Sequence, residues 1–441
     1  MKKNILLLTL PLLLASCGGT SSSSEVTTLP EGGDSNPTSS VATGSKALSI
    51  LFHVDKQSAE GIVYQRRLDA FNNAYAAQGL RVTGRFVART TGVSTYETEL
   101  TNMKNQGTLP DIITFDAPMC AKYAEDRFLY DISNQFSTEE LSAFLTTNTY
   151  GDKLYGLPIQ ESSAGFYYNK KLFADAGIDV SAYTAENPWT FSQFKNVCGK
   201  LAAKGITPVD MRLDATKDET ATYLLYPFIY AAGGEFLSKD GWTATGYFDS
   251  AATKNGFQFI KDCVDANYTS FAINPTDFFT GKVGMYLSSG WTIPDLDKKY
   301  TETFPSRDSW GLLPYPMDVQ KASCTGSWCF GVTDNGKADK SAAVTLLKFL
   351  TSKESSAAIV DTTGMISARK DVEGSDGAPE TLLRSQLAIS GRARPESVGY
   401  QTFSTTFGTV IASLKSKSVE EVVRSYSAQL NTELSELKDL Y

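Results

Sequence analysis

Three apolar runs decide the fold: ALSILF (47–52), RVTGRFV (81–87) and DIITF (111–115). Each has the length and the apolar or alternating pattern of a β-strand. Between them, residues 61–77 and 95–105 carry apolar side chains at helical spacing. The order strand, helix, strand, helix, strand predicts an α/β sheet with helices on both faces.

Polar side chains follow the first and third of these strands. His53, Asp55 and Lys56 come after the first strand, and Asp116 comes after the third. Ligands of open α/β sheets bind at the carboxyl ends of strands, so we expect these side chains to lie beside one another at a binding site. Two alternatives stay open: Asp116 could cap the helix that follows it, and Lys56 could be a solvated surface charge.

The beginning of the chain has the pattern of an export signal. Lysines at positions 2 and 3 precede an apolar run over 5–14 that is too short to span a bilayer. The letters LASC (14–17) look like a bacterial lipobox, so we interpret 1–17 as a lipoprotein signal peptide ending at a lipidated Cys17. A signal peptide with a chance cysteine is the alternative. We expect an extracytoplasmic protein, anchored to the cell membrane by the lipid on Cys17.

The residues after Cys17 predict a tether and then a large folded body. Residues 18–45 are small or polar almost throughout, which is typical of a disordered segment. Residues 46–441 exceed what one hydrophobic core usually organises, so two domains with a cleft between them are expected.

Composition excludes several classes of function. The net charge of -8 and the pI near 5.0 give no basic surface for nucleic acid. The single histidine, His53, rules out multi-histidine metal sites, and no Gly-x-Ser-x-Gly motif accompanies it. We therefore expect no catalytic residue, no metal and no cofactor.

Five cysteines follow Cys17. Because five is an odd number, at least one thiol is free whatever the pairing. Cys324 and Cys329 could form a disulfide if the chain turns between them, or all the cysteines could be buried as small apolar residues. The residues concerned are Cys120, Cys198, Cys263, Cys324 and Cys329.

Several short motifs follow one another in a characteristic order. Residues 155–158 read YGLP, residues 168–170 read YNK, and residues 188–190 read PWT. In this arrangement the chain resembles the extracellular solute-binding proteins of carbohydrate ABC importers (family 1, similar to maltose-binding protein). Trp189 and Thr190 are exchanged relative to that family's pattern.

Later segments extend the resemblance over nearly the whole body. Residues 224–240 look like the family's central helix with its glycine break, and 278–291 look like a segment that ends in a ligand-facing tryptophan. A glycine-rich strand and a helix follow in 326–368. The residues from Arg394 onward resemble the family's closing helices.

The resemblance implies a two-lobe periplasmic-binding-protein fold (type II), in which each lobe is a mixed sheet flanked by helices and the ligand cleft lies at the hinge. It places the N-terminal lobe at 46–158 plus 322–366 and the C-terminal lobe at 159–321 plus 367–441. Closure of the lobes would then capture the ligand.

A sugar ring offers apolar C–H faces and hydroxyl groups, so its site needs aromatic and polar side chains. Trp291 follows a small polar loop and Trp328 lies in a glycine-rich strand, although core packing is the alternative for both. The resemblance adds positions after the first strand, at a strand end and at the first crossover. The predicted ligand-binding residues are His53, Asp55, Lys56, Asp116, Glu161, Tyr223, Trp291, Trp328, Arg394 and Phe403, and Tyr226 and Tyr400 are further weak candidates.

These observations predict a lipid-anchored, monomeric receptor that binds a mono- or oligosaccharide and delivers it to the permease subunits of an ABC importer. The segment QESS (160–163) does not reproduce the hinge acid of maltose-binding protein, so the sugar is not specified. One alternative keeps the fold and changes the solute to a polyamine or an iron chelate. Another is an anchored glycan-degrading enzyme with Asp116 and Glu161 as its carboxylate pair.

Overall fold

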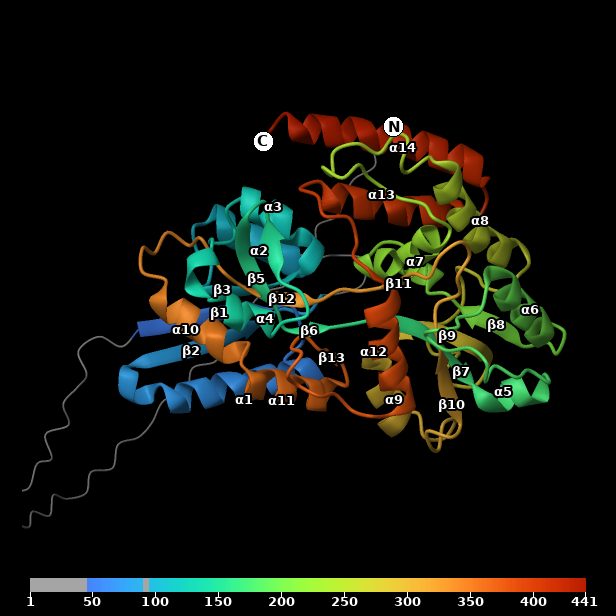
Figure 1. Ribbon diagram of the computed structural model, residues 1–441, viewed down its shortest axis with the longest axis horizontal. Coiled ribbons are helices and arrows are strands. Elements are labelled where there is room, and N and C mark those ends of the chain that lie inside the picture. The colour runs from blue at the N-terminus through green and yellow to red at the C-terminus, as the bar shows by residue number, and fades with distance from the viewer. Residues whose placement is uncertain (1–45, 90–94) are drawn as a thin grey trace, which may run out of the picture. The chain divides into compact units, whose positions relative to one another are not determined.

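The computed structural model describes residues 46–89 and 95–441 (Figure 1). The predicted lipidation site Cys17 and the predicted tether 18–45 lie outside these residues. The described residues form two larger β-sheets with helices packed around them, and two short two-stranded sheets.

The first large sheet has six strands in the order β2-β1-β3-β12-β5-β4. β1 pairs in parallel with both β2 and β3, which confirms the three strands predicted from the apolar runs. β12 is antiparallel to β3 and to β5. The strands are β1 (Lys46–Phe52), β2 (Leu80–Phe86), β3 (Ile112–Asp116), β4 (Asn148–Tyr150), β5 (Lys153–Pro158) and β12 (Trp328–Val332).

Helices cover this sheet on both sides, with α1 and α11 on one side and α2 and α3 on the other (Figure 1). The two helices predicted between the strands are α1 and α2. The helices are α1 (Ala59–Ala74), α2 (Thr95–Asn105), α3 (Cys120–Glu125), α4 (Thr138–Ser142), α10 (Ser341–Leu350) and α11 (Lys353–Thr363), with 3-10 turns η1 (Ala76–Gln78), η2 (Ala117–Met119) and η3 (Ser133–Gln135).

The second large sheet has four strands in the order β10-β7-β9-β8. Its neighbours are antiparallel except for the parallel pair β8 and β9. The strands are β7 (Ala164–Asn169), β8 (Thr207–Asp210), β9 (Val283–Ser289) and β10 (Trp310–Leu313). The helices of this half are α5 (Lys170–Asp175), α6 (Phe191–Ala202), α7 (Glu219–Ala231), α8 (Ala251–Asp265), α9 (Ile293–Lys298), α12 (Ala378–Ser390), α13 (Tyr400–Ser413) and α14 (Val419–Lys438), with η4 (Leu213–Ala215) and η5 (Gly290–Thr292).

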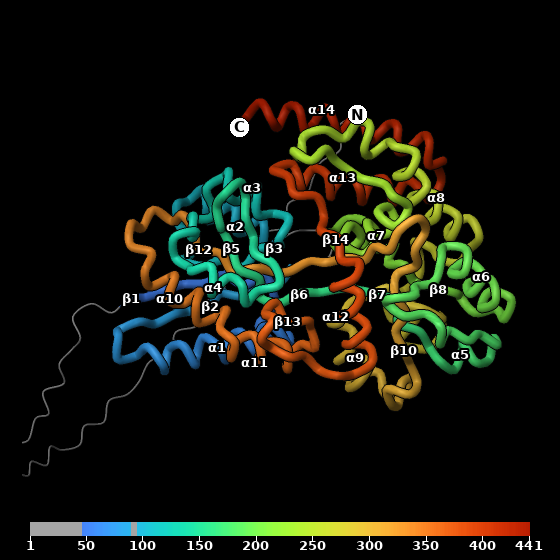
Figure 2. Tube along the Cα trace, in the orientation of Figure 1, coloured from blue at the N-terminus to red at the C-terminus, as the bar shows by residue number. Residues whose placement is uncertain are grey.

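The chain passes repeatedly between the two large sheets, as the trace in Figure 2 shows. One passage joins β5 to β7 through the short strand β6 (Gln160–Glu161), which pairs with β13 (Ile366–Ser367). Another joins β10 to β12 through β11 (Ser323–Cys324), which pairs with β14 (Gly391–Arg392). These short ladders satisfy backbone groups where the chain leaves one sheet for the other.

Burial inside the protein explains why α7 is apolar on nearly every face. Residues 221–231 of α7 are all buried, and the helix packs against α8 and α13. A helix that is apolar on every face is stable only inside a protein. No helix among the described residues has both the length and the apolar character needed to cross a membrane.

The five cysteines within the described part of the chain are buried free thiols. The disulfide between Cys324 and Cys329 is therefore not formed, and the alternative of buried small apolar residues describes the structure. Burial raises the pKa of the Cys324 thiol to about 11, so this thiol stays protonated at neutral pH.

Candidate ligand-binding site

A cavity of about 540 Å³ lies where the ends of β1, β3 and β12 approach the start of α7 and the turn η5. Its lining therefore comes from strands of the six-stranded sheet and from a helix and a turn of the other half of the molecule. Most of the residues predicted from the sequence line this cavity: His53, Asp55, Asp116, Tyr223, Trp291, Trp328 and Arg394.

Three predicted residues do not line this cavity. Lys56 is exposed, and its ammonium lies 5.8 Å from the centre of the Phe86 ring. The expectation that Phe403 contacts ligand is corrected, because Phe403 is completely buried and packs against Phe236 and Phe407 in the core. Glu161 is the third predicted residue that does not line this cavity.

Glu161 borders two further cavities, of about 400 and 530 Å³. It is 2% exposed, and its carboxylate accepts hydrogen bonds from the hydroxyls of Thr146 and Thr325. Burial raises the pKa of Glu161. Asp116 and Glu161 border different cavities, and both carboxylates are engaged by other side chains: Asp116 by Arg394, and Glu161 by Thr146 and Thr325.

The hydroxyls of the other two tyrosine candidates bond to the protein itself, and one of them bonds to a residue that lines the main cavity. The Tyr226 hydroxyl donates to the carbonyl of Arg392, and the Tyr400 hydroxyl donates to Glu219. Neither ring lines the cavity.

Two pairs of aromatic rings border the cavity. One pair comes from the half that contains the six-stranded sheet, and the other comes from the half that contains the four-stranded sheet. His53 stacks on Trp328 with 3.3 Å between ring centres and 1° between ring planes. The ring centres of Tyr223 and Trp291 are 5.9 Å apart, and Trp291 is 44% exposed. An exposed indole beside a cavity offers a flat apolar surface to a ligand.

Local interactions orient the His53 ring. Its Nδ1 lies 3.0 Å from the Thr114 hydroxyl on the neighbouring strand β3. Burial, with a further contribution from Arg89, holds the pKa of His53 well below its usual range. The imidazole is therefore neutral at pH 7.

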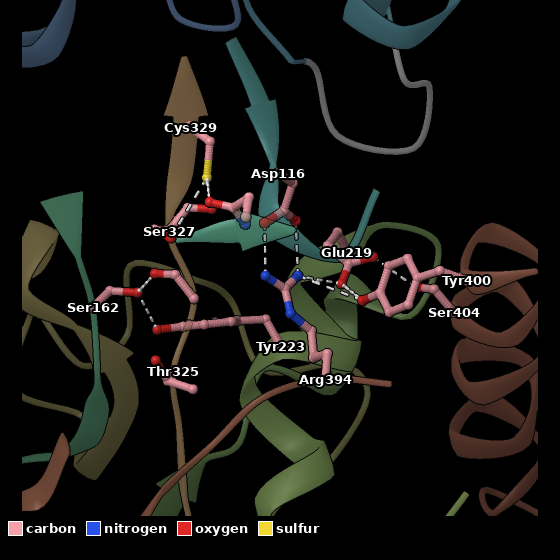
Figure 3. Close-up of polar contacts among 12 residues, drawn as sticks. Asp116, Ser162, Glu219, Tyr223, Thr325, Ser327, Cys329, Arg394, Tyr400 and Ser404 are labelled. Carbon is pink, nitrogen blue, oxygen red and sulfur yellow. Dashed lines mark hydrogen bonds and ion pairs between the residues drawn. The ribbon is translucent and has the colours of Figure 1, made fainter. Parts of the chain in front are cut away.

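Arg394 forms the main charged network of the site (Figure 3). Its guanidinium donates to both oxygens of Asp116, at 2.8 and 2.6 Å, and to Glu219 Oε1 at 2.6 Å. Glu219 also accepts from Ser404 Oγ at 2.6 Å. Asp116 precedes η2, but its side chain makes no capping hydrogen bond, so the capping alternative is wrong.

The crossover segments complete the lining. Ser162 Oγ lies 2.7 Å from the Tyr223 hydroxyl and donates to the carbonyl of Gly326 at 2.6 Å. A Cβ at Gly326 would lie 2.8 Å from a nitrogen of Arg394, so glycine lets the segment between β11 and β12 pass close to the guanidinium.

Several cavity residues were not predicted. Glu219 sits in the first turn of α7, where an acidic residue usually interacts only with the helix dipole. Glu60 also lies in the first turn of its helix, α1, and Arg89 follows β2. Gln160 lies in the crossover segment that differs from the family pattern, and this difference was the only signal available. Within 46–89 and 95–441, no group of three His, Cys, Asp or Glu side chains could hold a metal ion.

Comparison with known families agrees with this architecture. The sequence profile of the family described as bacterial extracellular solute-binding proteins matches residues 68–381 of this chain. The chain belongs to this family. Membership places this solute-binding protein outside the cytoplasm and in a family that binds solutes.

Individual relatives are more distant. A Brucella abortus (strain 2308) protein, named as a binding protein with no ligand specified, is 28% identical over 253 residues, which are 54% of this chain and 57% of the relative. The chain thus spans little more than half the length of the curated relatives it matches.

Solved structures show the fold. The cyclic alpha-maltosyl-1,6-maltose binding protein of Arthrobacter globiformis superposes with a TM-score of 0.74 at 22% identity, over 89% of this chain and 100% of that one. UgpB of Mycobacterium tuberculosis, in complex with glycerophosphocholine, superposes with a TM-score of 0.72 at 16% identity, over 89% and 100%. The predicted two-lobe, mixed α/β fold is confirmed.

Proposed function

We propose that this solute-binding protein captures a mono- or oligosaccharide in the main cavity and delivers it intact to the permease subunits of an ABC importer. The observation that carries the proposal is the pair of aromatic surfaces, His53 with Trp328 and Tyr223 with Trp291, around a cavity with many polar groups. A sugar ring presents apolar faces and a rim of hydroxyl groups that such a site complements. The Arthrobacter relative binds a saccharide by name, which supports the same ligand class.

The proposed capture step is closure of two lobes, 46–158 plus 322–366 and 159–321 plus 367–441. The passages of the chain through β6 and β11 support this division, because few segments join the sheets and the cavity lies beside them. Hinges are short segments of this kind, and ligand stabilises the closed state in proportion to its preference for that state.

We also propose that the protein is a monomer tethered to the membrane by a lipid on Cys17, followed by the tether 18–45. The lipobox-like letters LASC (14–17) support this proposal. Metabolic labelling with a fatty-acid analogue tests it: the full chain should be labelled and Cys17→Ser should not. Labelling of the variant, or absence of label from the full chain, would contradict the anchor.

The ligand proposal is tested by thermal melting of residues 46–441 with mono- and oligosaccharides. A ligand that binds only the folded state adds RT ln(1 + [L]/Kd), about 2.7 kcal/mol at a hundredfold excess over Kd. A selective upward shift that Trp291→Ala abolishes supports a saccharide receptor. The saccharide should be recovered intact, whereas release of reducing ends would indicate an enzyme.

A second candidate keeps the fold and binds a different polar solute. UgpB shares the fold and binds glycerophosphocholine, so the architecture alone does not specify a sugar. The melting panel should therefore include glycerophosphocholine, a polyamine and an iron chelate. A shift with one of these and with no saccharide would replace the carbohydrate.

A further inference from the structure

We infer that the cavity selects a neutral saccharide over an anionic one, and that Gln160 sets part of this specificity by accepting a hydrogen bond from a ligand hydroxyl. This inference rests on the proposed carbohydrate function and adds to it the charge class of the ligand and a residue that recognises it. Two features of the cavity carry it: an unpaired buried acceptor and the absence of an available cation.

The unpaired acceptor is Gln160 Oε1. Gln160 lines the cavity, is 3% exposed, and has a buried Oε1 with no hydrogen-bond partner. Its other amide atom, Nε2, donates to Glu60 Oε1 at 2.6 Å. Because Nε2 is already engaged by the carboxyl group, the free oxygen can be satisfied only by a donor, such as a hydroxyl group.

The backbone holds this acceptor in place. Gln160 belongs to β6 and is paired with Ser367 of β13. Glu60 lies in the first turn of α1, whose N-terminus Ser58 caps. A Cβ at Gly61 would lie 2.1 Å from the Asp55 carbonyl, so the turn before α1 is packed directly against the helix. An acceptor fixed from two sides is preorganised for one donor position.

The guanidinium groups in the cavity are already neutralised. Arg394 bonds to Asp116 and Glu219, and Arg89 forms an ion pair with Glu97 at 3.2 Å. His53 is neutral at pH 7 because burial lowers its pKa. Among the described residues that line the cavity, no cation lacks a carboxylate partner.

Carboxylates also outnumber cations in the lining. The acidic residues are Asp55, Glu60, Asp116 and Glu219, against two arginines. Burial raises the pKa of Glu60, so the repulsion of an anion rests on Asp55, Asp116 and Glu219. A ligand carboxylate or phosphate would find no free cation and would face these three carboxylates, whereas a neutral ligand with hydroxyl groups meets neither cost.

Calorimetric titration of residues 46–441 at pH 7 tests the inference with matched disaccharides. One series is neutral, and the other carries a hexuronic acid in place of one hexose. We expect a neutral disaccharide to bind and its uronate to bind at least about tenfold more weakly. Equal or tighter binding of the uronate would overturn the inference and leave the carbohydrate function standing. Binding in neither series overturns both.

A variant tests Gln160 itself. Gln160→Met keeps the length of the side chain and removes the acceptor, so affinity for the neutral disaccharide should fall about tenfold. Gln258→Met is the matched control, because Gln258 makes the same kind of bond, to Asp262 at 2.8 Å, on the exposed face of α8. Unchanged affinity in a folded Gln160→Met, or an equal loss in both variants, would contradict the role of Gln160. If Gln160→Met does not fold, the wild-type titrations decide the inference.

Discussion

Arg394 donates two hydrogen bonds to Asp116 across a separation of 278 residues. The contact joins the end of β3 in the six-stranded sheet to the segment that follows β14, and Glu219 of α7 completes the network. The side chains of Arg394 and Asp116 are 3% and 10% exposed. Bidentate geometry and a third acceptor offset the cost of removing these charges from water.

Loss of Arg394 should strongly destabilise the fold. Arg394→Met leaves Asp116 and Glu219 buried with no cation, and we expect the free energy of unfolding to fall by about 3–5 kcal/mol. Urea denaturation measures the change. Arg392→Met is the control, because Arg392 pairs with Glu235 at the surface, where an ion pair contributes about 0–1 kcal/mol. An equal decrease in the free energy of unfolding in both variants would show that the buried network stabilises the fold no more than a surface ion pair.

Replacing Trp291 should lower the affinity for ligand and change the stability of the fold little. Its indole is 44% exposed beside the cavity, so Trp291→Ala removes a ligand surface without opening a core cavity. We expect affinity for the saccharide to fall by about 10–100-fold, which corresponds to about 1.4–2.8 kcal/mol. Titration calorimetry measures the affinity and thermal melting measures the stability. Trp242→Ala, a half-buried tryptophan outside the cavity, should leave the affinity unchanged.

Asp210 should make stability depend on pH. Burial raises its pKa from 3.8 to about 6, although the backbone N–H of Arg212 and its charge oppose the shift. The folded state therefore binds the proton more tightly than the unfolded state, and the free energy of unfolding falls as pH rises from about 4 to 6. The expected loss is about 3 kcal/mol, and it is complete above the folded pKa.

Comparison with Asp210→Asn isolates this contribution, because the variant has no proton to lose. Its stability relative to the wild type should increase between pH 4 and 6 and then stay constant, as measured by urea denaturation at each pH. The exposed Asp175, paired with Lys171, supplies the control Asp175→Asn. A difference that does not change with pH would contradict the assigned burial.

The buried thiols should be unreactive in the folded protein. Cys120, Cys198, Cys263, Cys324 and Cys329 are free and buried, so residues 46–441 should react with a thiol reagent only after unfolding. Mass spectrometry after non-reducing denaturation and alkylation should find every one of them modified. A pair that resists alkylation until reduced would reveal a disulfide, and a reductant would then lower the melting temperature.

Short-range patterns made much of the fold predictable. The strands at 47–52, 81–87 and 111–115 and the helices between them follow from the spacing of apolar side chains, which reflects backbone geometry over a few residues. Polar residues after β1 and β3 were predicted to meet, and His53, Asp55 and Asp116 do line one cavity, because neighbouring parallel strands end at the same edge.

Residues with similar sequence contexts nevertheless differ in ways that no local pattern specifies. Phe403 and Trp291 were both proposed to contact ligand, yet Phe403 packs among Phe236 and Phe407 while Trp291 is exposed. Both are large aromatic residues near helix starts, so periodicity does not separate them. Their burial depends on which helices pack against them.

The amino-acid sequence by itself determined the order of the first three strands and the two helices between them, the resemblance to solute-binding proteins and the polar positions after β1 and β3. These properties depend on neighbours within a few residues and on motifs that keep their order along the chain. Only the tertiary structure decided that β12 lies between β3 and β5, that Arg394 bonds to Asp116, and that Gln160 meets Glu60. Such partners are a hundred or more residues apart, and their meeting depends on how all the packed elements fill space together.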